Sequence, residues 1–402
     1  MQVKAGAGRF TFRGNLRDTR HGWLRLTPAY SLHLVRELVA RRTRADLPVL
    51  DPFCGTGTTL LACSELGVPC DTLELNPFLV WLARAKVARY DPAAVRQAQA
   101  LLETAARRAL ASRASCEWTP PLHNIERWWD RATLCALSRA WTAIQGGDLS
   151  PRARDLCRLA FCRSLVGVSS ASFRHQSMSF AKPVTPTAAR ARARVASLLG
   201  ESMASLARGA ALPLPSTRRR VVQGDARAVA QALGGRSYGT VITSPPYANR
   251  MSYIRELRPY MYWLGHLSDG RSAGELDWRA IGGTWGQATS NLVHWRAPAA
   301  ARRGLSSLVR SIAQESAVLS RYVERYFVDM AQHLASLRQL VADGGSIHYV
   351  VGNSKFFDVV VPVEELLAAE MKAAGFSRPR IERLRKRTSK KELYEFAVSA
   401  AG

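Results

Sequence analysis

The chain has 402 residues, 47% of them hydrophobic, and contains no run of 18 consecutive apolar residues. This composition predicts a soluble globular protein with one large or two ordinary domains, and it excludes a membrane-spanning helix. The formal net charge of +26 favours a polyanionic partner, nucleic acid first. Since only 8 of the 57 basic residues are Lys, a general enrichment in Arg would account for part of this charge.

The N-terminus and the cysteines indicate the compartment. Residues 1–22 are rich in Gly and Arg and are expected to form a basic arm, without the apolar segment of a signal peptide. The cysteines form no C-x-x-C pair and have no His at zinc-site spacing, so we predict buried thiols and no metal. These features predict a protein of the reducing cytoplasm. The cysteines are Cys54, Cys63, Cys70, Cys116, Cys135, Cys157 and Cys162.

The first motif is a Gly-containing turn between a strand and a helix. A helix is predicted from near Thr27-Pro28 to about Arg41, and a short buried strand at residues 47–50. Residues 51–59, Asp-Pro-Phe-Cys-Gly-Thr-Gly-Thr-Thr, follow that strand, and residues 60–66 are expected to be helical. The glycines allow positive φ, and the helix N-terminus offers N–H groups to a carboxylate. The turn lacks the Lys-Ser/Thr of a P-loop and the third Gly of a dinucleotide fingerprint.

A second strand is predicted from Val68 to Leu75, and it ends in the tetrapeptide Glu74-Leu75-Asn76-Pro77. Glu74 lies about 20 residues after the glycines, where an acidic side chain at a strand end can bind both hydroxyls of a ribose. An ordinary exposed acid at a strand end is the alternative. Pro77 is expected to begin a helix that reaches about Ala88.

Residues 91–220 interrupt the alternation of strands and helices. Apolar residues recur there at helical spacing, and we predict four to six helices with Trp128 and Trp129 in their core. Residues 168–180 break this pattern with Ser, aromatic and basic side chains, a mixture suited to bases and phosphates. A Ser-rich loop between helices is the alternative.

Two further strands are followed by polar turns. Residues 221–226 are predicted to be a strand and a turn in which Asp225 can accept a hydrogen bond from the amine of an adenine ring. Residues 238–242 are predicted to be a buried strand, and residues 243–247, Thr-Ser-Pro-Pro-Tyr, follow it. The two prolines force the chain out of the sheet in a stiff extended turn.

This turn would present three groups to a ligand: the Ser244 hydroxyl, the Pro245 carbonyl and the Tyr247 ring. Ligands bind at the carboxyl ends of strands in open α/β sheets. An acceptor beside an aromatic ring can hold a flat heterocycle by its exocyclic amine.

The rest of the chain continues the alternation, which predicts a doubly wound α/β sheet. Residues 268–320 are predicted to be a second insertion. The later elements are a helix at 321–341, a strand at 346–351, a helix at 364–374 and an antiparallel pair at 380–384 and 394–398.

Four motifs in this order resemble the DNA methyltransferases that modify N4 of cytosine or N6 of adenine with S-adenosylmethionine. They are residues 51–58, 74–77, 224–225 and 244–247. The resemblance covers about residues 25–90 and 220–400, and it implies a Rossmann-like, seven-stranded methyltransferase sheet.

The resemblance also implies a division of the chain. Residues 23–90 and 221–402 would form the catalytic domain that binds S-adenosylmethionine. Residues 91–220, inserted between the second and third strands, would recognise the target, and residues 268–320 would add DNA contacts. Double-stranded DNA is the implied partner. A restriction endonuclease or another defence-system protein is a possible second partner, and the sequence does not indicate an oligomeric state.

The family implies a role for each matched residue. In the catalytic turn, Ser244 and the Pro245 carbonyl would accept hydrogen bonds from the target amine, and Tyr247 would stack on a flipped base beside Pro246. The methyl group would pass in line to the amine, with no metal and no covalent intermediate. The implied cofactor-binding residues are Thr27, Pro28, Asp51, Phe53, Gly55, Gly57, Thr58, Glu74, Asn76 and Asp225. The candidates for nucleic-acid binding are Arg174, His175, Gln176, Arg250, Tyr253 and Trp285.

Three alternatives stay open. Ser244 at the first motif position resembles cytosine-N4 enzymes, whereas Asp or Asn there would resemble adenine-N6 enzymes. An RNA amino-methyltransferase shares the Gly turn and a Pro-Pro-Tyr turn, usually with Asp first. A DNA-binding protein on a decayed methyltransferase fold is the non-enzymatic alternative. The cytosine-C5 class is disfavoured because its Pro-Cys would follow the fourth strand, whereas Pro69-Cys70 begins the second.

Overall fold

The computed structural model describes most of the chain. Six residues with predicted roles lie outside the described part: Thr27, Pro28, Arg174, His175, Gln176 and Trp285. The described residues are 11, 14–15, 19–24, 30–112, 115–172, 179–180, 186–284, 286–298, 305–387 and 392–402.

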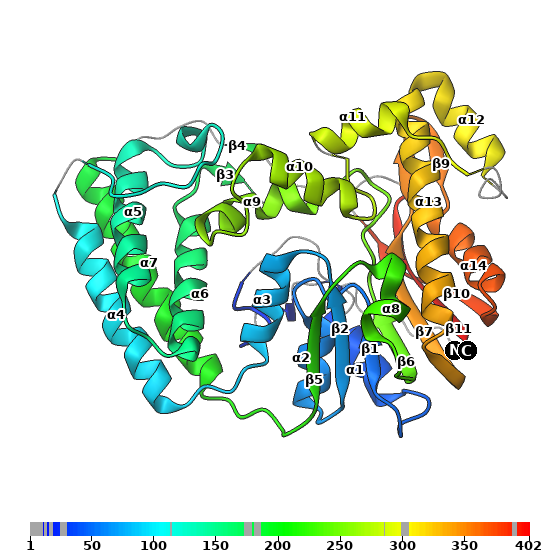
Figure 1. The fold of residues 1–402 in the computed structure, drawn as a ribbon, viewed down its shortest axis with the longest axis horizontal. Helices are drawn as coiled ribbons and strands as arrows, with labels where there is room; N and C mark the ends of the chain where they lie inside the picture. Colours follow the sequence, from blue (N-terminus) through cyan, green and yellow to red (C-terminus); the bar gives the residue numbers. More distant parts are fainter. Residues whose placement is uncertain are drawn as a thin grey trace.

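The described residues form one seven-stranded sheet flanked by helices (Figure 1). Its strand order is β10-β11-β7-β6-β1-β2-β5, and all strands are parallel except β11, which runs antiparallel to both neighbours. In chain order this is 3-2-1-4-5-7-6 with the seventh strand reversed. The predicted doubly wound, Rossmann-like methyltransferase sheet is therefore confirmed. The strands are β1 (Val49–Asp51), β2 (Cys70–Glu74), β5 (Arg219–Gln223), β6 (Tyr238–Thr243), β7 (Val341–Gly352), β10 (Ser377–Lys386) and β11 (Tyr394–Ala401).

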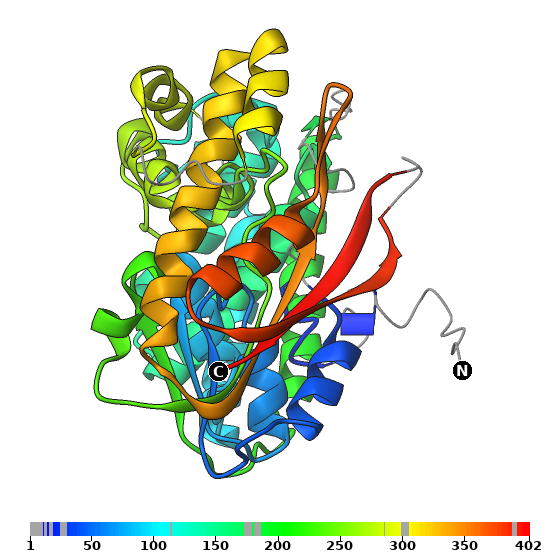
Figure 2. The ribbon, with the colours of Figure 1, turned by 90° about the vertical axis from the view of Figure 1, so that its right-hand side faces the viewer.

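The two faces of the sheet are covered by different helices because neighbouring strand residues point to opposite sides. Leu50 and Val241 join the apolar cluster of α8, α13 and α14, whereas Val49 and Ile242 join that of α1, α2 and α3. Figure 2 shows β10, β11 and α14 on the side nearest the viewer. These helices are α1 (Leu32–Ala40), α2 (Thr58–Glu65), α3 (Pro77–Lys86), α8 (Val229–Leu233), α13 (Ala317–Arg338) and α14 (Val363–Ala373).

A helical bundle lies between β2 and β5 in the sequence and beside the sheet in space (Figure 1). Its core contains Trp128 and Trp129, each 1% exposed, which confirms that these side chains are buried. The same apolar cluster includes Phe78 of α3 and Trp263 of α9 (Tyr253–Trp263), so the bundle packs directly on the sheet-bearing part. Its helices are α4 (Pro92–Leu110), η2 (Ile125–Arg127), α5 (Arg131–Gly146), α6 (Pro151–Gly167) and α7 (Ala188–Ala210).

Residues 168–180 include two short paired strands, β3 (Ala171–Ser172) and β4 (Ser179–Phe180). After the Pro-Pro turn the chain forms α9 (Tyr253–Trp263), and the described part of residues 268–320 includes further helices before α13. These are α10 (Gly270–Arg279), α11 (Gln287–His294) and α12 (Ser306–Glu315). A second short pair, β8 (Ser354–Phe356) and β9 (Val359–Val361), follows β7. Among the described residues, no helix combines the length and apolar composition needed to cross a bilayer.

The expectation of seven free thiols is wrong for one pair. Cys116 and Cys135 are joined by a disulfide, with Cα atoms 4.3 Å apart. Cys135 lies on α5, and the segment before η2 passes beside that helix, because Ser138 of α5 accepts the amides of Glu117 and Trp118. Spacing along the chain could not reveal this approach. The other five cysteines are buried and free, as predicted.

Candidate active site

The four predicted motifs meet at one edge of the sheet. Each follows the carboxyl end of a parallel strand, and the four strands are adjacent in the order β5, β2, β1 and β6. Asp225, Glu74, Asp51 and Ser244 therefore follow one another along that edge. This is where open α/β sheets bind ligands.

Asp51 joins the Gly turn to the end of β6. Its carboxylate accepts the Phe53 amide at 3.1 Å and the Thr243 hydroxyl at 2.6 Å. The side chain is fully buried, and burial raises its pKa to about 6 despite these hydrogen bonds. Tyr30 packs behind it, with its hydroxyl bonded to Thr59 and 3.4 Å from the carboxylate. Asp51 is thus positioned to hold the two turns in register.

The Gly turn has the predicted backbone geometry. Gly55 and Gly57 have φ of +50° and +79°, and a Cβ at Gly57 would meet Ala83 at 3.4 Å. Gly57 precedes α2, so the turn runs straight into a helix N-terminus at Thr58. Lys86, fully removed from water, donates to the Thr56 carbonyl at 3.0 Å. The Lys86 hydrogen bond therefore stabilises the turn whose positive φ angles the glycines permit.

Phe53 is held by a neutral histidine. Its ring meets that of His333 edge-on, with centroids 4.7 Å apart. The His333 nitrogens contact the Ala226 carbonyl at 2.8 Å and the Tyr349 hydroxyl at 2.6 Å. Burial lowers the pKa of His333 to about 4, so the ring is uncharged at neutral pH.

Glu74 bridges the Gly turn and the start of α3. Its carboxylate accepts the Gly55 amide at 2.8 Å and the Asn76 amide at 2.9 Å. Asn76 is the N-cap of α3, and its side chain accepts the Phe78 amide. Burial raises the pKa of Glu74 to about 7. A carboxylate has about four acceptor positions, so Glu74 retains capacity for hydroxyl donors.

Asp225 is part of an ion-pair network that the sequence did not reveal. Arg227 lies 2.6 Å from its carboxylate and 3.0 Å from that of Asp329 on α13. Although partial burial opposes it, the hydrogen bonds and charge of Arg227 hold the pKa of Asp225 below its usual value. Asp225 is therefore an ionised acceptor at neutral pH, held in one orientation.

The Ser244 hydroxyl is oriented as an acceptor. It donates its single proton to the Val350 carbonyl at 2.9 Å, which leaves its lone pairs for another donor. Among the described residues no donor bonds the Pro245 carbonyl. The Pro246 carbonyl, by contrast, accepts the Tyr326 hydroxyl at 2.8 Å. Ser244 and Pro245, which are adjacent in the chain, therefore each retain acceptor capacity at the strand end.

Tyr247 is held by contacts at its hydroxyl, its amide and its ring. Its hydroxyl donates to Glu395 of β11 at 2.8 Å, and its amide donates to the Tyr253 hydroxyl at 3.3 Å. The Arg387 guanidinium lies over the ring, 5.0 Å from its centroid. A Cβ at Gly352 would lie 3.0 Å from the ring and still closer to the Arg387 guanidinium, so a side chain there would force these groups to shift. The ring is partly exposed.

Two of the predicted nucleic-acid residues are described. Arg250 is exposed, has a φ of +62° and donates its amide to the Tyr322 hydroxyl at 3.1 Å. Tyr253 supports the catalytic turn through its hydroxyl and begins α9. Sequence reasoning missed the supporting residues Thr243, Tyr326 and Glu395. Of these three residues, only Thr243 could have been suspected from the sequence, because it directly precedes Ser244.

Comparison with known proteins adds short matches. No protein-family model matches the chain. A stretch of 68 residues is 34% identical to the type II methyltransferase M.AvaI of Nostoc sp. (strain PCC 7120 / SAG 25.82 / UTEX 2576), covering 17% of this chain and 14% of that protein. A stretch of 58 residues is 34% identical to the type II methyltransferase M.MjaII of Methanocaldococcus jannaschii, covering 14% of this chain and 11% of that protein. The matches thus span about a seventh or less of those curated relatives.

Among solved structures, the rRNA methyltransferase aviRa from Streptomyces viridochromogenes aligns over 99% of this chain and 93% of its own. The sequence identity is 13% and the TM-score is 0.32. A TM-score this low carries no argument, so the fold and the candidate site are described from the strand order and the site geometry given above.

Proposed function

We propose that this protein transfers a methyl group from S-adenosylmethionine to the exocyclic N4 amine of a cytosine in DNA. The observation that carries the proposal is the orientation of Ser244. Its hydroxyl donates to the Val350 carbonyl and so offers lone pairs beside the Pro245 carbonyl. Two adjacent acceptors suit an amine with two N–H donors.

The residues at the sheet edge fit S-adenosylmethionine. Gly55 has a φ of +50°, and a Cβ there would have only the Phe53 carbonyl within 4 Å, at 3.8 Å, so the backbone of the turn is open to a ligand at this position. Glu74 would accept both ribose hydroxyls, and Asp225 would accept the adenine amine. The other residues proposed to line the cofactor site are Asp51, Phe53, Thr58 and Asn76. Bound there, S-adenosylmethionine would supply an electrophilic methyl group.

The chain's own contribution to the reaction is positioning. Ser244 and the Pro245 carbonyl would each accept one N–H of the target amine, which draws its lone pair out of conjugation. Tyr247, held by Glu395 and Arg387, would fix the plane of the flipped base. Asp51 binds both turns, so the amine and the cofactor would be held in one frame. Such positioning can supply several kcal/mol of the acceleration.

Methyl transfer from isotope-labelled S-adenosylmethionine tests the proposal. Unmethylated duplex DNA and bulk RNA are the substrates, and products are digested to nucleosides and identified by mass. We expect N4-methylcytosine from DNA. N6-methyladenine from DNA would overturn the base assignment and leave the mechanism, and label confined to RNA would overturn the DNA assignment. A protein that binds neither cofactor nor nucleic acid would contradict the enzyme assignment altogether.

A further inference from the structure

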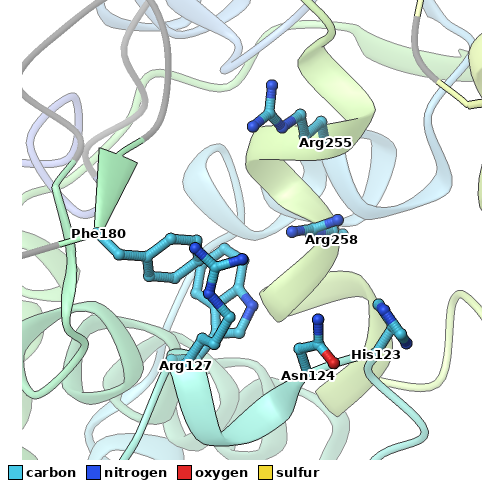
Figure 3. A pocket seen from close by; sticks show the side chains of 7 residues that line it. His123, Asn124, Arg127, Phe180, Arg255 and Arg258 are labelled. Atoms are coloured by element: carbon cyan, nitrogen blue, oxygen red, sulfur yellow. The ribbon is translucent and has the colours of Figure 1, made fainter.

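A polar pocket lies where the bundle meets α9 (Figure 3). It has a volume of about 240 Å³. Three separate segments contribute to it: the residues before and within η2, the short strand β4, and the first turns of α9. The polar and aromatic side chains that line it are His123, Asn124, Arg127, Trp128, Phe180, Arg255 and Arg258.

The pocket is positively charged. None of the described residues that line it is acidic, whereas Arg127, Arg255 and Arg258 each bring a guanidinium group. Burial, followed by the charges of Arg255 and Arg127, lowers the pKa of Arg258 to about 10. Three guanidinium groups around one cavity repel one another, and a bound anion would relieve that repulsion.

Aromatic rings hold two of the guanidinium groups in place. Arg127 lies over Phe180, with its Cζ 4.7 Å from the ring centroid, and Arg258 lies over Trp128 at 5.3 Å. The two rings meet edge-on at 5.2 Å. Stacking fixes the planes of both guanidinium groups in advance, and a planar guanidinium can donate two parallel hydrogen bonds to the oxygens of a phosphate.

A single helix connects the pocket to the catalytic turn. Tyr253, the first residue of α9, accepts the Tyr247 amide, and Arg255 and Arg258 follow on the same helix. With a rise of 1.5 Å per residue, Tyr253 and Arg258 are separated by about 7.5 Å along the axis. That separation corresponds to roughly two nucleotide steps of a strand at 3.4 Å each.

We propose that this pocket binds a phosphodiester group of the nucleic-acid strand, a few nucleotides from the target base. The proposal rests on the proposed function for its substrate class, and the net charge of +26 agrees with a polyanion. The pocket would anchor the backbone through Arg127 and Arg255 and leave base reading to other residues. The bundle would then contribute to substrate binding through the rim that faces α9.

The test is the salt dependence of duplex DNA binding by the full chain, measured by fluorescence anisotropy. The double variant Arg127→Gln, Arg255→Gln should bind about tenfold or more weakly at low salt, because charge-assisted bonds are lost. The slope of log affinity against log salt should shrink by about 0.9, the value for one phosphate contact. Arg96→Gln, at an exposed position of α4, is the matched control and should change neither quantity.

Equal affinity and slope in the double variant and in Arg96→Gln would overturn the pocket assignment. So would tight binding of a mononucleotide that the double variant loses, because the site would then take a free nucleotide. The single variant Arg127→Gln, at an exposed position, repeats the test if the double variant melts at a lower temperature. If the double variant binds DNA more weakly but the wild type transfers no methyl group, the pocket assignment is supported and the proposed function is contradicted. If the wild type transfers methyl groups but the double variant binds DNA as tightly as the wild type, the proposed function is supported and the pocket assignment is overturned.

Discussion

The sheet edge and the inserted bundle use buried side chains in opposite ways. At the edge, polar groups such as Asp51 and Thr243 are completely buried and bonded to one another. In the bundle the buried side chains are mainly apolar, as with Trp141 and Phe161, whose rings lie 4.7 Å apart. Buried polar groups are costly unless they are paired, so their concentration at one edge indicates chemistry, whereas the bundle interior indicates support.

Despite this difference in buried side chains, the bundle is not a separate structural unit. Phe78 of α3 stacks on Tyr260 of α9 with centroids 5.2 Å apart, and both belong to the apolar cluster of the bundle. The function of the bundle is therefore expected at its surface, where it meets α9. Substitutions at the edge should alter catalysis or cofactor binding, and substitutions in the bundle interior should alter only stability.

The largest expected effect is that of Ser244→Ala. Methyl transfer should fall by about 100- to 1000-fold, as for the loss of one well-placed group in a transition state. Cofactor affinity should stay within about twofold, because Ser244 would touch only the target amine. Single-turnover transfer and calorimetric titration measure the two quantities. Ser197→Ala, on an exposed turn of α7, is the control. A large loss of cofactor binding in Ser244→Ala would contradict its role.

Glu74→Ala should weaken cofactor binding by about tenfold or more, because the proposed bonds from the ribose hydroxyls to its carboxylate would be lost together with the support of the Gly55 amide. Calorimetric titration with S-adenosylmethionine measures the change. Glu103→Ala, at an exposed position of α4, should leave the affinity unchanged. Unaltered affinity in Glu74→Ala would remove the ribose role.

Val195→Ala tests the bundle interior. Val195 is completely buried in α7, and losing two buried carbons with a residual cavity should lower the free energy of unfolding by about 2 kcal/mol. Cofactor affinity should not change. Val293→Ala, where the side chain is 41% exposed, should change stability by less than about 0.5 kcal/mol. A cofactor defect in Val195→Ala would break the distinction between the two regions, and denaturant titration with calorimetry would show it.

The smallest expected effect is a dependence of cofactor affinity on pH. The pKa of Glu74 is raised to about 7, so below that pH the carboxyl is increasingly protonated and accepts hydroxyl donors poorly. Affinity should therefore rise between pH 6 and 8, by about tenfold, and level off above the pKa. Titrations at four pH values measure the curve. Glu74→Gln should flatten it, and an equally steep curve in that variant would assign the effect elsewhere.

Much of the sheet and of the candidate site was predictable because its signals are local. Apolar runs predicted the strands, Gly55 and Gly57 predicted a turn with positive φ, and Pro245-Pro246 predicted the exit from the sheet. Asn76 before Pro77 is a helix start in both sequence and structure. The placement of the four motifs at one edge also followed, because parallel strands align their carboxyl ends.

Contacts between distant segments depended on tertiary packing. Ser244 and Val350 are 106 positions apart, and Arg227 and Asp329 are 102 apart. The disulfide of Cys116 and Cys135, and the pocket between η2, β4 and α9, likewise join separate segments. A strand or turn preference is set by neighbouring residues, whereas the partner of a hydroxyl or a guanidinium is set by how whole helices and strands pack. The amino-acid pattern therefore determined which groups reach the sheet edge, and the fold alone decided which way each of them points.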